Sequence, residues 1–220
     1  MSTIVLAEHN NNELKSVTLS AINAASNIDE KIDVLVVGSE CQNVVNTLSK
    51  VEKIKKIIVV DDPKYLNPIA EFISPILISL SKDYSHILSA ASTFGKNVMP
   101  RVAALLDVAQ ISDIIKIESD DTFIRPIYAG NAFATVQSTD TIKVITVRPT
   151  SFDPVVLEGG ETKIENLSFN DDNNNKVEFI KREETKSDRP ELGTARVVIS
   201  GGRGLGSAEN FSLLNEIADK

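Results

Sequence analysis

The sequence predicts an α/β fold with an open, mostly parallel sheet and an added antiparallel ribbon. Over residues 3–107, short apolar runs alternate four times with segments of helical period, as expected for parallel strands joined by crossover helices. The run at residues 33–38 is apolar along its length, which is typical of a strand covered on both faces. After Ile111 the runs follow one another with only turns between them, and this spacing favours antiparallel pairs.

Four strand–helix pairs account for the first half of the chain. The strands are expected at Thr3–Ala7, Asp33–Gly38, Lys56–Val60 and Tyr84–Ala91. The helices are expected at Glu13–Ser26, Cys41–Ser49, Asn67–Ser81 and Gly95–Asp107. Pro75 falls inside the third helix, where it should kink or split it because proline lacks the N–H that the helix needs.

The ribbon follows. Its strands are expected at Asp113–Glu118, Thr122–Ala129, Phe133–Gln137 and Ile142–Val147. Ser119–Asp121 and Gly130–Asn131 have hairpin chemistry, and Pro126 should lie at an edge or a bulge. Two more strands, Lys163–Phe169 and Lys176–Lys181, are expected around a polar turn at Asn170–Asn175, with a linker at Arg182–Leu192.

The most informative stretch lies near the C-terminus, where a β-branched run (Val197–Ile199), a glycine-rich turn (Gly201–Gly206) and a helical segment follow one another. This order directs backbone N–H groups and the helix dipole at an anion, and Arg203 adds a planar cation suited to phosphate. The spacing fits neither the dinucleotide fingerprint, which meets Ser207 or Glu209 at its sixth position, nor a P-loop, which needs Lys after its last glycine. We interpret the turn as half of a phosphate or cofactor cradle; a tight connection that binds nothing fits the glycines equally well.

The last helical segment has an apolar face formed by Phe211, Leu214, Ile217 and Ala218. A face of this kind needs a sheet to cover it, and the sequence offers none beyond the preceding run. We therefore expect the residues from about 193 onward to be loosely packed, or docked non-natively, in this chain alone.

Composition and charge restrict the function further. With 42% hydrophobic and 25% charged residues the chain is of the soluble globular type. A net charge of −8 argues against nucleic-acid binding, because phosphate contacts need clustered Lys and Arg. The single cysteine, Cys41, excludes an intrachain disulfide and fits a reducing compartment. No apolar run is long enough for direct membrane insertion, and the first strand leaves no room for a leader, so we expect a cytoplasmic bacterial protein, or a mitochondrial matrix protein if eukaryotic.

Other reactive side chains are scattered. His9 and His86 lie at or near strands, and ordinary hydrogen bonding is a better explanation for each than catalysis or metal binding. Cys41 opens a helix and is expected to be inert. The acidic residues Glu118, Asp120 and Asp121 are best interpreted as a solvated hairpin turn.

Two further segments leave alternatives open. Arg125 and Tyr128 could anchor an interface, since both residue types are common binding hot spots, or they could simply pack within the ribbon. Ser92–Lys96 follows the fourth strand and opens a helix, so it could bind an anion, although Lys96 could equally be surface charge.

Several segments resemble the alpha subunit of electron transfer flavoprotein. The glycine turn with its flanks (Val197–Phe211) is similar to the opening of that family's FAD domain. The other similar segments, in the same order, are Ile4–Asn10, Thr93–Ala104 and Glu118–Asn131. The family's FAD domain continues well past the glycine turn, so the chain carries only the start of it.

The resemblance implies a domain at residues 1–190 with a fold like that of the adenine nucleotide alpha hydrolases, then the first strand, turn and helix of a truncated Rossmann-like FAD domain at 191–220. It implies an electron carrier and not an enzyme, with no catalytic residue and no metal. Arg203 aligns with an FAD-contacting arginine. The implied partners are a beta subunit that carries AMP, acyl-CoA and related dehydrogenases of fatty acid beta-oxidation as donors, and a quinone oxidoreductase as acceptor.

A rival interpretation from another class stays open on the sequence alone. An α/β enzyme or regulatory protein that binds ATP or AMP would also fit the first half of the chain, with its functional residues in loops at the carboxyl ends of the strands. Its phosphate loop would have to be Thr93–Lys96, the one weak candidate. A scaffold subunit without any ligand is a third possibility.

Overall fold

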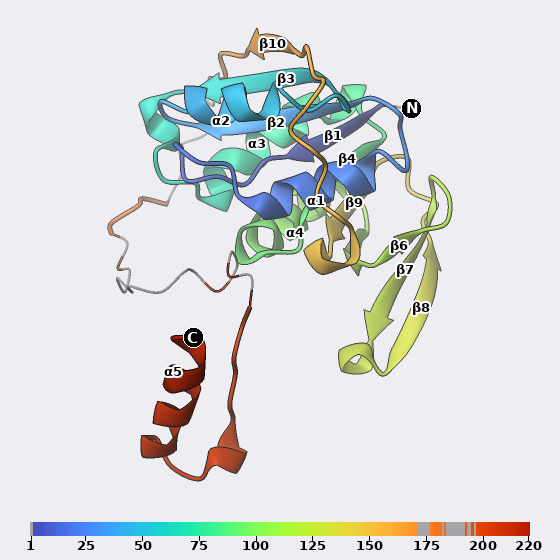
Figure 1. Ribbon diagram of the computed structural model, residues 1–220. Coiled ribbons are helices and arrows are strands. Elements are labelled where there is room, and N and C mark those ends of the chain that lie inside the picture. The colour runs from blue at the N-terminus through green and yellow to red at the C-terminus, as the bar shows by residue number, and fades with distance from the viewer. Residues whose placement is uncertain (1, 171–176, 182, 184–191, 193–194, 196) are drawn as a thin grey trace. The chain divides into compact units, whose positions relative to one another are not determined.

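The computed structural model describes residues 2–170, 177–181, 183, 192, 195 and 197–220 (Figure 1). Its contacts divide the chain into two compact units, Met1–Phe179 and Ile180–Lys220, which we describe separately. The first unit contains an open parallel sheet with helices on both faces and a smaller antiparallel sheet, so the predicted α/β class is confirmed.

The larger sheet has seven strands in the order β10-β3-β2-β1-β4-β9-β5, and its neighbouring strands all pair in parallel. Its strands are β1 (Thr3–Leu6), β2 (Ile32–Gly38), β3 (Ile54–Asp61), β4 (His86–Ala90), β5 (Gln110–Ile114), β9 (Lys143–Val147) and β10 (Lys163–Asn166). From β1 the chain winds outward through β2 to β3 and then returns to β4 on the other side. The crevice between β1 and β4 is therefore the topological switch point of the sheet.

Helices cover both faces of this sheet. They are α1 (Ser16–Ala25), α2 (Gln42–Leu48), α3 (Ala70–Leu80) and α4 (Thr93–Leu106). Strand β2 shows how the layers meet, because Val34 and Val36 join the apolar cluster under α1 and α2 while Leu35 and Val37 join the cluster under α3 and α4. Alternate side chains of one buried strand thus serve two cores. α3 runs through Pro75 as one helix, so the proline does not split it.

The predicted antiparallel ribbon is present as a separate three-stranded sheet of β6 (Lys116–Ile117), β7 (Thr122–Ile127) and β8 (Ala132–Gln137). The run expected at Asp113–Glu118 is divided, because its first residues belong to β5 of the parallel sheet and only β6 belongs to the ribbon. Figure 1 shows it standing out from the β5–β9 side of the parallel sheet. Pro126 pairs with Phe133 of β8, beyond the point where the β6 ladder ends at Ile124, and so takes an edge position as predicted. Residues 118–121, which include the acidic Glu118, Asp120 and Asp121, form the turn between β6 and β7.

The run at Ile142–Val147 was assigned to this ribbon from the sequence, and that prediction is wrong. It forms β9, which lies between β4 and β5 inside the parallel sheet. The physical reason is burial, since Val144, Ile145, Thr146 and Val147 are all completely inaccessible to solvent. Only a strand covered on both faces can bury every side chain, and the interior of a parallel sheet provides that cover.

The two strands expected after residue 160 have different outcomes. The first is present as β10, which pairs in parallel with β3 at the edge of the sheet. The second is not formed over the described residues 177–181, which have no regular secondary structure. The predicted polar turn at Asn170–Asn175 lies outside the described residues except for Asn170, and the linker at Arg182–Leu192 does so except for residues 183 and 192.

The second unit is small. Its regular elements, among the residues described, are two 3₁₀ turns at Arg203–Leu205 and Glu209–Phe211 and one helix, α5 (Ser212–Ala218). The predicted strand at Val197–Ile199 is not formed. A strand is stabilised by hydrogen bonds to a neighbouring strand, and no described residue of this unit is assigned to one.

Candidate functional site

The glycine-rich turn of the second unit is the main candidate site. Leu205 N–H donates to Gly202 O at 3.0 Å and Gly206 N–H donates to Arg203 O at 3.1 Å, which closes a 3₁₀ turn. Gly206 has a φ of 80°, a left-handed conformation that favours glycine. The turn is therefore a defined local structure that uses some of its own N–H groups, so fewer remain to contact an anion than the sequence pattern suggests.

The outer surface of the turn is open. A Cβ atom placed on Gly202 or Gly204 would meet no other heavy atom within 4 Å, and the Arg203 side chain between them is exposed. Gly201 faces inward instead, because a Cβ there would come within 2.6 Å of both Leu205 and Leu214. The turn thus rests on the helix through Gly201 and presents Arg203 outward, where its guanidinium can donate to a ligand.

The helix after the turn differs from the sequence prediction. It starts at Ser212, after a second 3₁₀ turn, and not directly behind the glycines. Of its predicted apolar face, Leu214 is half-buried by its contact with the turn, whereas Phe211 and Ile217 are exposed. The expectation of an incompletely covered face is confirmed for this unit.

The switch point between β1 and β4 is the second place where such a sheet could bind a ligand. Glu8 follows β1, and its Oε2 accepts a hydrogen bond of 2.5 Å from the Ser92 hydroxyl, which follows β4. Ser92 Oγ also accepts from Gly95 N–H at 3.1 Å and so caps α4. Lys96 is exposed. The sequence analysis did not predict this pair. It could have been found from the strand order, because β1 and β4 are parallel neighbours and the residues that follow them therefore lie close together.

The Glu8–Ser92 pair weakens the nucleotide-binding interpretation. A nucleotide phosphate at this crevice would have to sit at the N-terminus of α4, where helix N–H groups attract anions. A hydrogen-bonded carboxylate already lies beside that terminus, and two like charges at hydrogen-bond range repel each other. A Cβ on Gly95 would also come within 1.9 Å of Ala90 O, so helix and strand are already in close contact. The predicted loop at 92–96 is thus a capped helix start with an acid against it.

The two histidines and the cysteine have structural and not catalytic surroundings: both histidines are hydrogen-bonded, and the cysteine is buried. His9 Nδ1 accepts from Asn11 N–H at 3.0 Å, and burial lowers the pKa of His9 to about 4. His86 Nε2 lies 2.6 Å from Asp120 O, and burial lowers its pKa as well. Burial, followed by the charge of Asp61, raises the pKa of the Cys41 thiol to about 12, so the thiol is unreactive. Among the described residues no cluster of His, Cys, Asp or Glu could hold a metal ion.

The acidic turn of the ribbon is also satisfied locally. Asp121 accepts hydrogen bonds from Thr122, Gln137 and Ser119, which hold the pKa of its carboxyl at about 2. Glu118 forms an ion pair with Lys116 at 2.6 Å. Arg125 Nε donates to Ser112 O at 2.8 Å, so this side chain braces the ribbon, whereas Tyr128 is 80% exposed. The two predicted anchors therefore separate into one structural and one exposed residue.

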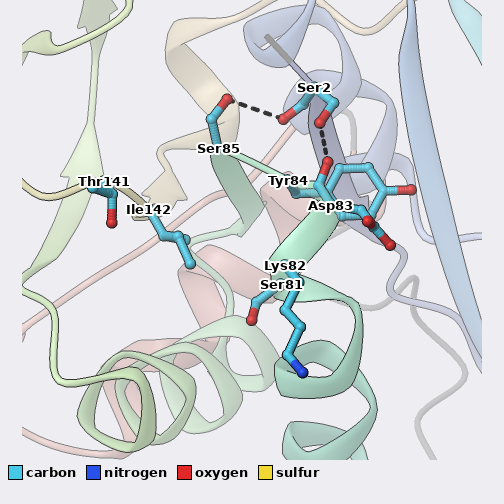
Figure 2. A pocket seen from close by; sticks show the side chains of 8 residues that line it. All are labelled: Ser2, Ser81, Lys82, Asp83, Tyr84, Ser85, Thr141 and Ile142. Carbon is cyan, nitrogen blue, oxygen red and sulfur yellow. Dashed lines mark hydrogen bonds between the residues drawn. The ribbon is translucent and has the colours of Figure 1, made fainter.

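A polar hollow of about 470 Å³ lies at the amino-terminal edge of the parallel sheet (Figure 2). Ser2 Oγ donates to Asp83 O and Ser85 Oγ donates to Ser2 O, while Lys82 points away from these serines. In open α/β sheets ligands bind at the carboxyl edge of the strands, and this hollow lies at the opposite edge. The hydroxyl groups of Ser2, Ser81 and Ser85 donate to nearby backbone carbonyls, so the hollow has the features of a structural junction.

An open parallel α/β unit followed by a separate unit with a glycine-rich turn places the chain in the class of α/β proteins. Comparison with known proteins narrows this class. A family described as "Electron transfer flavoprotein domain" matches residues 3–172. The chain is 49% identical over 220 residues to the electron transfer flavoprotein subunit alpha of Pseudomonas aeruginosa, covering all of the chain and 71% of that protein.

Mitochondrial proteins are also similar. The Dictyostelium discoideum electron transfer flavoprotein subunit alpha is 46% identical, over 98% of this chain and 65% of that protein. A probable mitochondrial subunit alpha of Caenorhabditis elegans is 43% identical, over all of this chain and 66% of that protein. The chain belongs to the electron transfer flavoprotein alpha subunit family, and it spans about two thirds of the length of these relatives. The helices of the described region include none that could cross a membrane.

Proposed function

We propose that the chain acts as the alpha subunit of a heterodimeric electron transfer flavoprotein, an electron carrier and not an enzyme. The observation that carries the proposal is the 49% identity to the Pseudomonas aeruginosa protein over all 220 residues, a stretch that includes the glycine turn. In this proposal residues 1–190 form a structural N-terminal domain and residues 191–220 begin the FAD-binding domain. A bacterial chain would work in the cytoplasm and a eukaryotic one in the mitochondrial matrix.

The glycine turn fits one wall of a flavin site. Arg203 is exposed and carries a fixed charge with a planar set of donors, which suits a phosphate or a flavin carbonyl oxygen. The open space over Gly202 and Gly204 lets a ligand approach the backbone closely. Bound FAD would supply the electron-accepting and electron-donating chemistry, while the protein binds it and tunes its electronic properties.

The partners follow from the same proposal. A beta subunit carrying AMP would complete the flavin cleft. Acyl-CoA and related dehydrogenases of fatty acid beta-oxidation would deliver electrons, and a quinone oxidoreductase would accept them. In this proposal the crevice between β1 and β4 of the alpha subunit binds no nucleotide. The Glu8 carboxylate supports this, because it lies beside the N-terminus of α4, where a phosphate would otherwise be favoured.

A first test uses the chain by itself. One arginine and a turn cannot bury a flavin, and tight cofactor sites enclose most of the ligand. We therefore expect the purified 220-residue chain to leave added FAD fluorescent and to lose it on desalting. Stoichiometric, tight FAD binding would place the site elsewhere in this chain and contradict the assignment to the turn.

A second test adds the part of a relative that lies beyond the matched stretch. Residues 1–220 are joined to the remaining part of the Pseudomonas aeruginosa alpha subunit and produced together with the beta subunit of that organism. We expect a complex that retains FAD and AMP, both measurable after denaturation by chromatography. Arg203→Ala should weaken FAD retention at least about tenfold and Arg203→Lys less, because lysine keeps the charge but loses the planar fork.

The matched control is Arg101→Ala, which removes another partly exposed arginine, one paired with Glu71 at 3.6 Å. It should leave FAD binding unchanged. If Arg203→Ala and Arg101→Ala behave alike, Arg203 does not contact the flavin. A wild-type chimera that forms no complex and binds no flavin would reject the proposed function itself.

A further inference from the structure

A cavity of about 250 Å³ lies where the ribbon joins the parallel sheet. Residues 109–111, at and just before the start of β5, line one side of it. Arg125 of β7 and residues 136–140, from the end of β8 and the loop toward β9, line the other. The buried Ile111 and the half-buried Val136 give it apolar walls. The volume is far above the roughly 15 Å³ at which a cavity can hold one water molecule, so a small ion fits inside.

Arg125 is the cation of this cavity, and the fold uses only part of its guanidinium. Its Nε–H donates to Ser112 O at 2.8 Å, which fixes the side chain. Its two Nη groups have no hydrogen-bond or ion-pair partner among the described residues. A guanidinium stays charged at every physiological pH and carries its donors in a plane. The free end can therefore donate a pair of hydrogen bonds to an oxyanion.

The other two arginines of the first unit have carboxylate partners. Arg101 pairs with Glu71 at 3.6 Å, and Arg148 pairs with Asp113. Arg125 is the single charged residue between positions 122 and 139, so β7, β8 and the turn between them supply no counter-ion for it. An unpaired, half-buried cation attracts an anion from solution more strongly than a paired one, because no protein carboxylate competes for its donors.

Two hydroxyl groups add further donors. Ser138 Oγ accepts from Asp140 N–H at 3.4 Å, so its own hydrogen stays available to a ligand. The Thr139 side chain is exposed and has no hydrogen-bond partner among the described residues. In this respect the cavity differs from the hollow of Figure 2, where serine hydroxyls donate to backbone carbonyls. A site that retains free donors can bind a ligand rich in acceptor oxygens.

The carboxylate of Asp140 also lines this cavity. Its Oδ2 accepts from Ala109 N–H at 2.9 Å, which holds the side chain in place. Arg125 and Asp140 line the same cavity, yet these two described residues form no ion pair with each other. An oxyanion without a proton is repelled by the carboxylate. An oxyanion that keeps a proton can donate it in a hydrogen bond to Asp140 while its other oxygens accept from Arg125.

We propose that this cavity binds inorganic phosphate, with Arg125, Ser138 and Thr139 donating to its oxygens and Asp140 accepting its proton in a hydrogen bond. Inorganic phosphate keeps at least one proton throughout the neutral pH range, whereas sulfate has none. A phosphate monoester loses its last proton at a pH of about 6. The cavity therefore prefers inorganic phosphate to both. Bound phosphate links the ribbon to the loop before β9, and neither FAD nor a second subunit takes part.

The test titrates the 220-residue chain with inorganic phosphate by isothermal titration calorimetry at pH 7.5 and constant ionic strength. We expect one site with a dissociation constant of about 1 mM or lower. Sulfate and methyl phosphate should bind at least about tenfold more weakly, because sulfate has no proton for Asp140 and methyl phosphate has mostly lost its own. In nuclear magnetic resonance spectra, phosphate should shift the amide signals of residues 109–111 and 136–140.

Substitutions then assign the roles. Arg125→Gln should weaken phosphate binding at least about tenfold, whereas the matched control Arg101→Gln, outside the cavity, should stay within about twofold of wild type. Asp140→Asn should bring the affinity for sulfate within about threefold of that for phosphate, because the amide NH₂ can donate to an oxygen without a proton. The amide oxygen still accepts from Ala109 N–H, so this variant keeps the backbone contact.

The thermal midpoint without phosphate checks the fold of each variant, since Arg125 also braces the ribbon. If Arg125→Gln fails to fold, Asp140→Asn decides. A dissociation constant for phosphate above about 10 mM overturns the proposal. So does a wild-type chain that binds sulfate or methyl phosphate as tightly as phosphate, or a preference that Asp140→Asn leaves unchanged.

Equal losses from Arg125→Gln and Arg101→Gln would show that the ion responds only to the net charge of the chain, and would also contradict the site. These titrations contain no FAD and no beta subunit. Their failure therefore leaves the proposed flavoprotein function untouched, and a failure of that function leaves this site in place.

Discussion

The two units of the chain differ in how far their apolar side chains are buried from solvent. In the first unit both faces of the parallel sheet are covered, and the β-branched residues of β2 are buried in two separate cores. In the second unit Val197 is 62% exposed and Phe211 and Ile217 are also exposed. The first unit therefore contains the interactions that fold it, while the second presents apolar surface that a binding partner or further protein could cover.

The difference follows from how much structure each segment brings with it. Residues 3–147 supply strands and the helices that cover them, so the apolar side chains of strands such as β1, β2, β4 and β9 are buried within the unit. The second unit supplies a turn and one helix, and its best-defined contact brings Gly201 against Leu214 and Leu205. We expect stability to be concentrated in the first unit and the candidate cofactor contact, Arg203, in the second.

The largest effect should come from a cavity in the first unit. Leu35 is fully buried in the core under α3 and α4, so Leu35→Ala should lower the free energy of unfolding by about 2–5 kcal/mol. Urea unfolding followed by circular dichroism measures this change. Leu213→Ala in α5, where the side chain is 55% exposed, is the control. Equal losses from the two substitutions would remove the distinction between the units.

A smaller effect should come from pH at the carboxyl edge of the parallel sheet. His9 has its pKa lowered to about 4 by burial, so the folded state favours neutral His9 while the unfolded state protonates it near 6.5. The stability due to neutral His9 is complete above about pH 6.5 and is lost as the pH falls toward 4. A shift of this size corresponds to about 2–3 kcal/mol between pH 7.5 and 4.5.

The comparison that isolates His9 is with His9→Asn, which removes the titrating group. The difference in unfolding free energy between wild type and His9→Asn should shrink by that amount as the pH falls from 7.5 to 4.5. His86 also has a lowered pKa, but it is present in both proteins and cancels. A difference that stays constant with pH would show that His9 is solvated in the folded protein.

The sequence was sufficient for the parts of the fold that depend on local pattern. Apolar, β-branched runs predicted the first four strands. After Ile111 the runs follow one another without helical segments between them, and this spacing predicted the antiparallel sheet. It was insufficient where distant segments decide the outcome. β9 looked like a ribbon strand because it follows one closely, yet it pairs with β4, whose residues lie 57 positions earlier in the chain. The strand predicted at Val197–Ile199 had suitable residues but no described strand to pair with.

The candidate site divides in the same way. Arg203 and its glycines stood out because their spacing is local, and the structure leaves them exposed. The Glu8–Ser92 pair joins residues 84 positions apart and exists only because β1 lies beside β4. Residue chemistry alone left an anion site at 92–96 open, whereas the fold brings a carboxylate there. The residue pattern of one segment therefore does not reveal which distant residues lie beside it, because that depends on the order of the strands in the sheet.

The smallest effect should come from the apolar face of α5, and it tests the comparison most directly. Ile217 is 48% exposed, so Ile217→Ala removes few contacts in this chain and should change the unfolding free energy by less than about 0.5 kcal/mol. In the chimera that includes the remaining Pseudomonas segment, the same substitution should cost about 2 kcal/mol or more, because the side chain would then be covered. Thermal or urea unfolding of the four proteins gives both numbers. A large loss in the 220-residue chain would mean that α5 is already packed. Small losses in both proteins would mean that this face is not a folding surface, and its exposed residues would then have to be explained by binding to another protein.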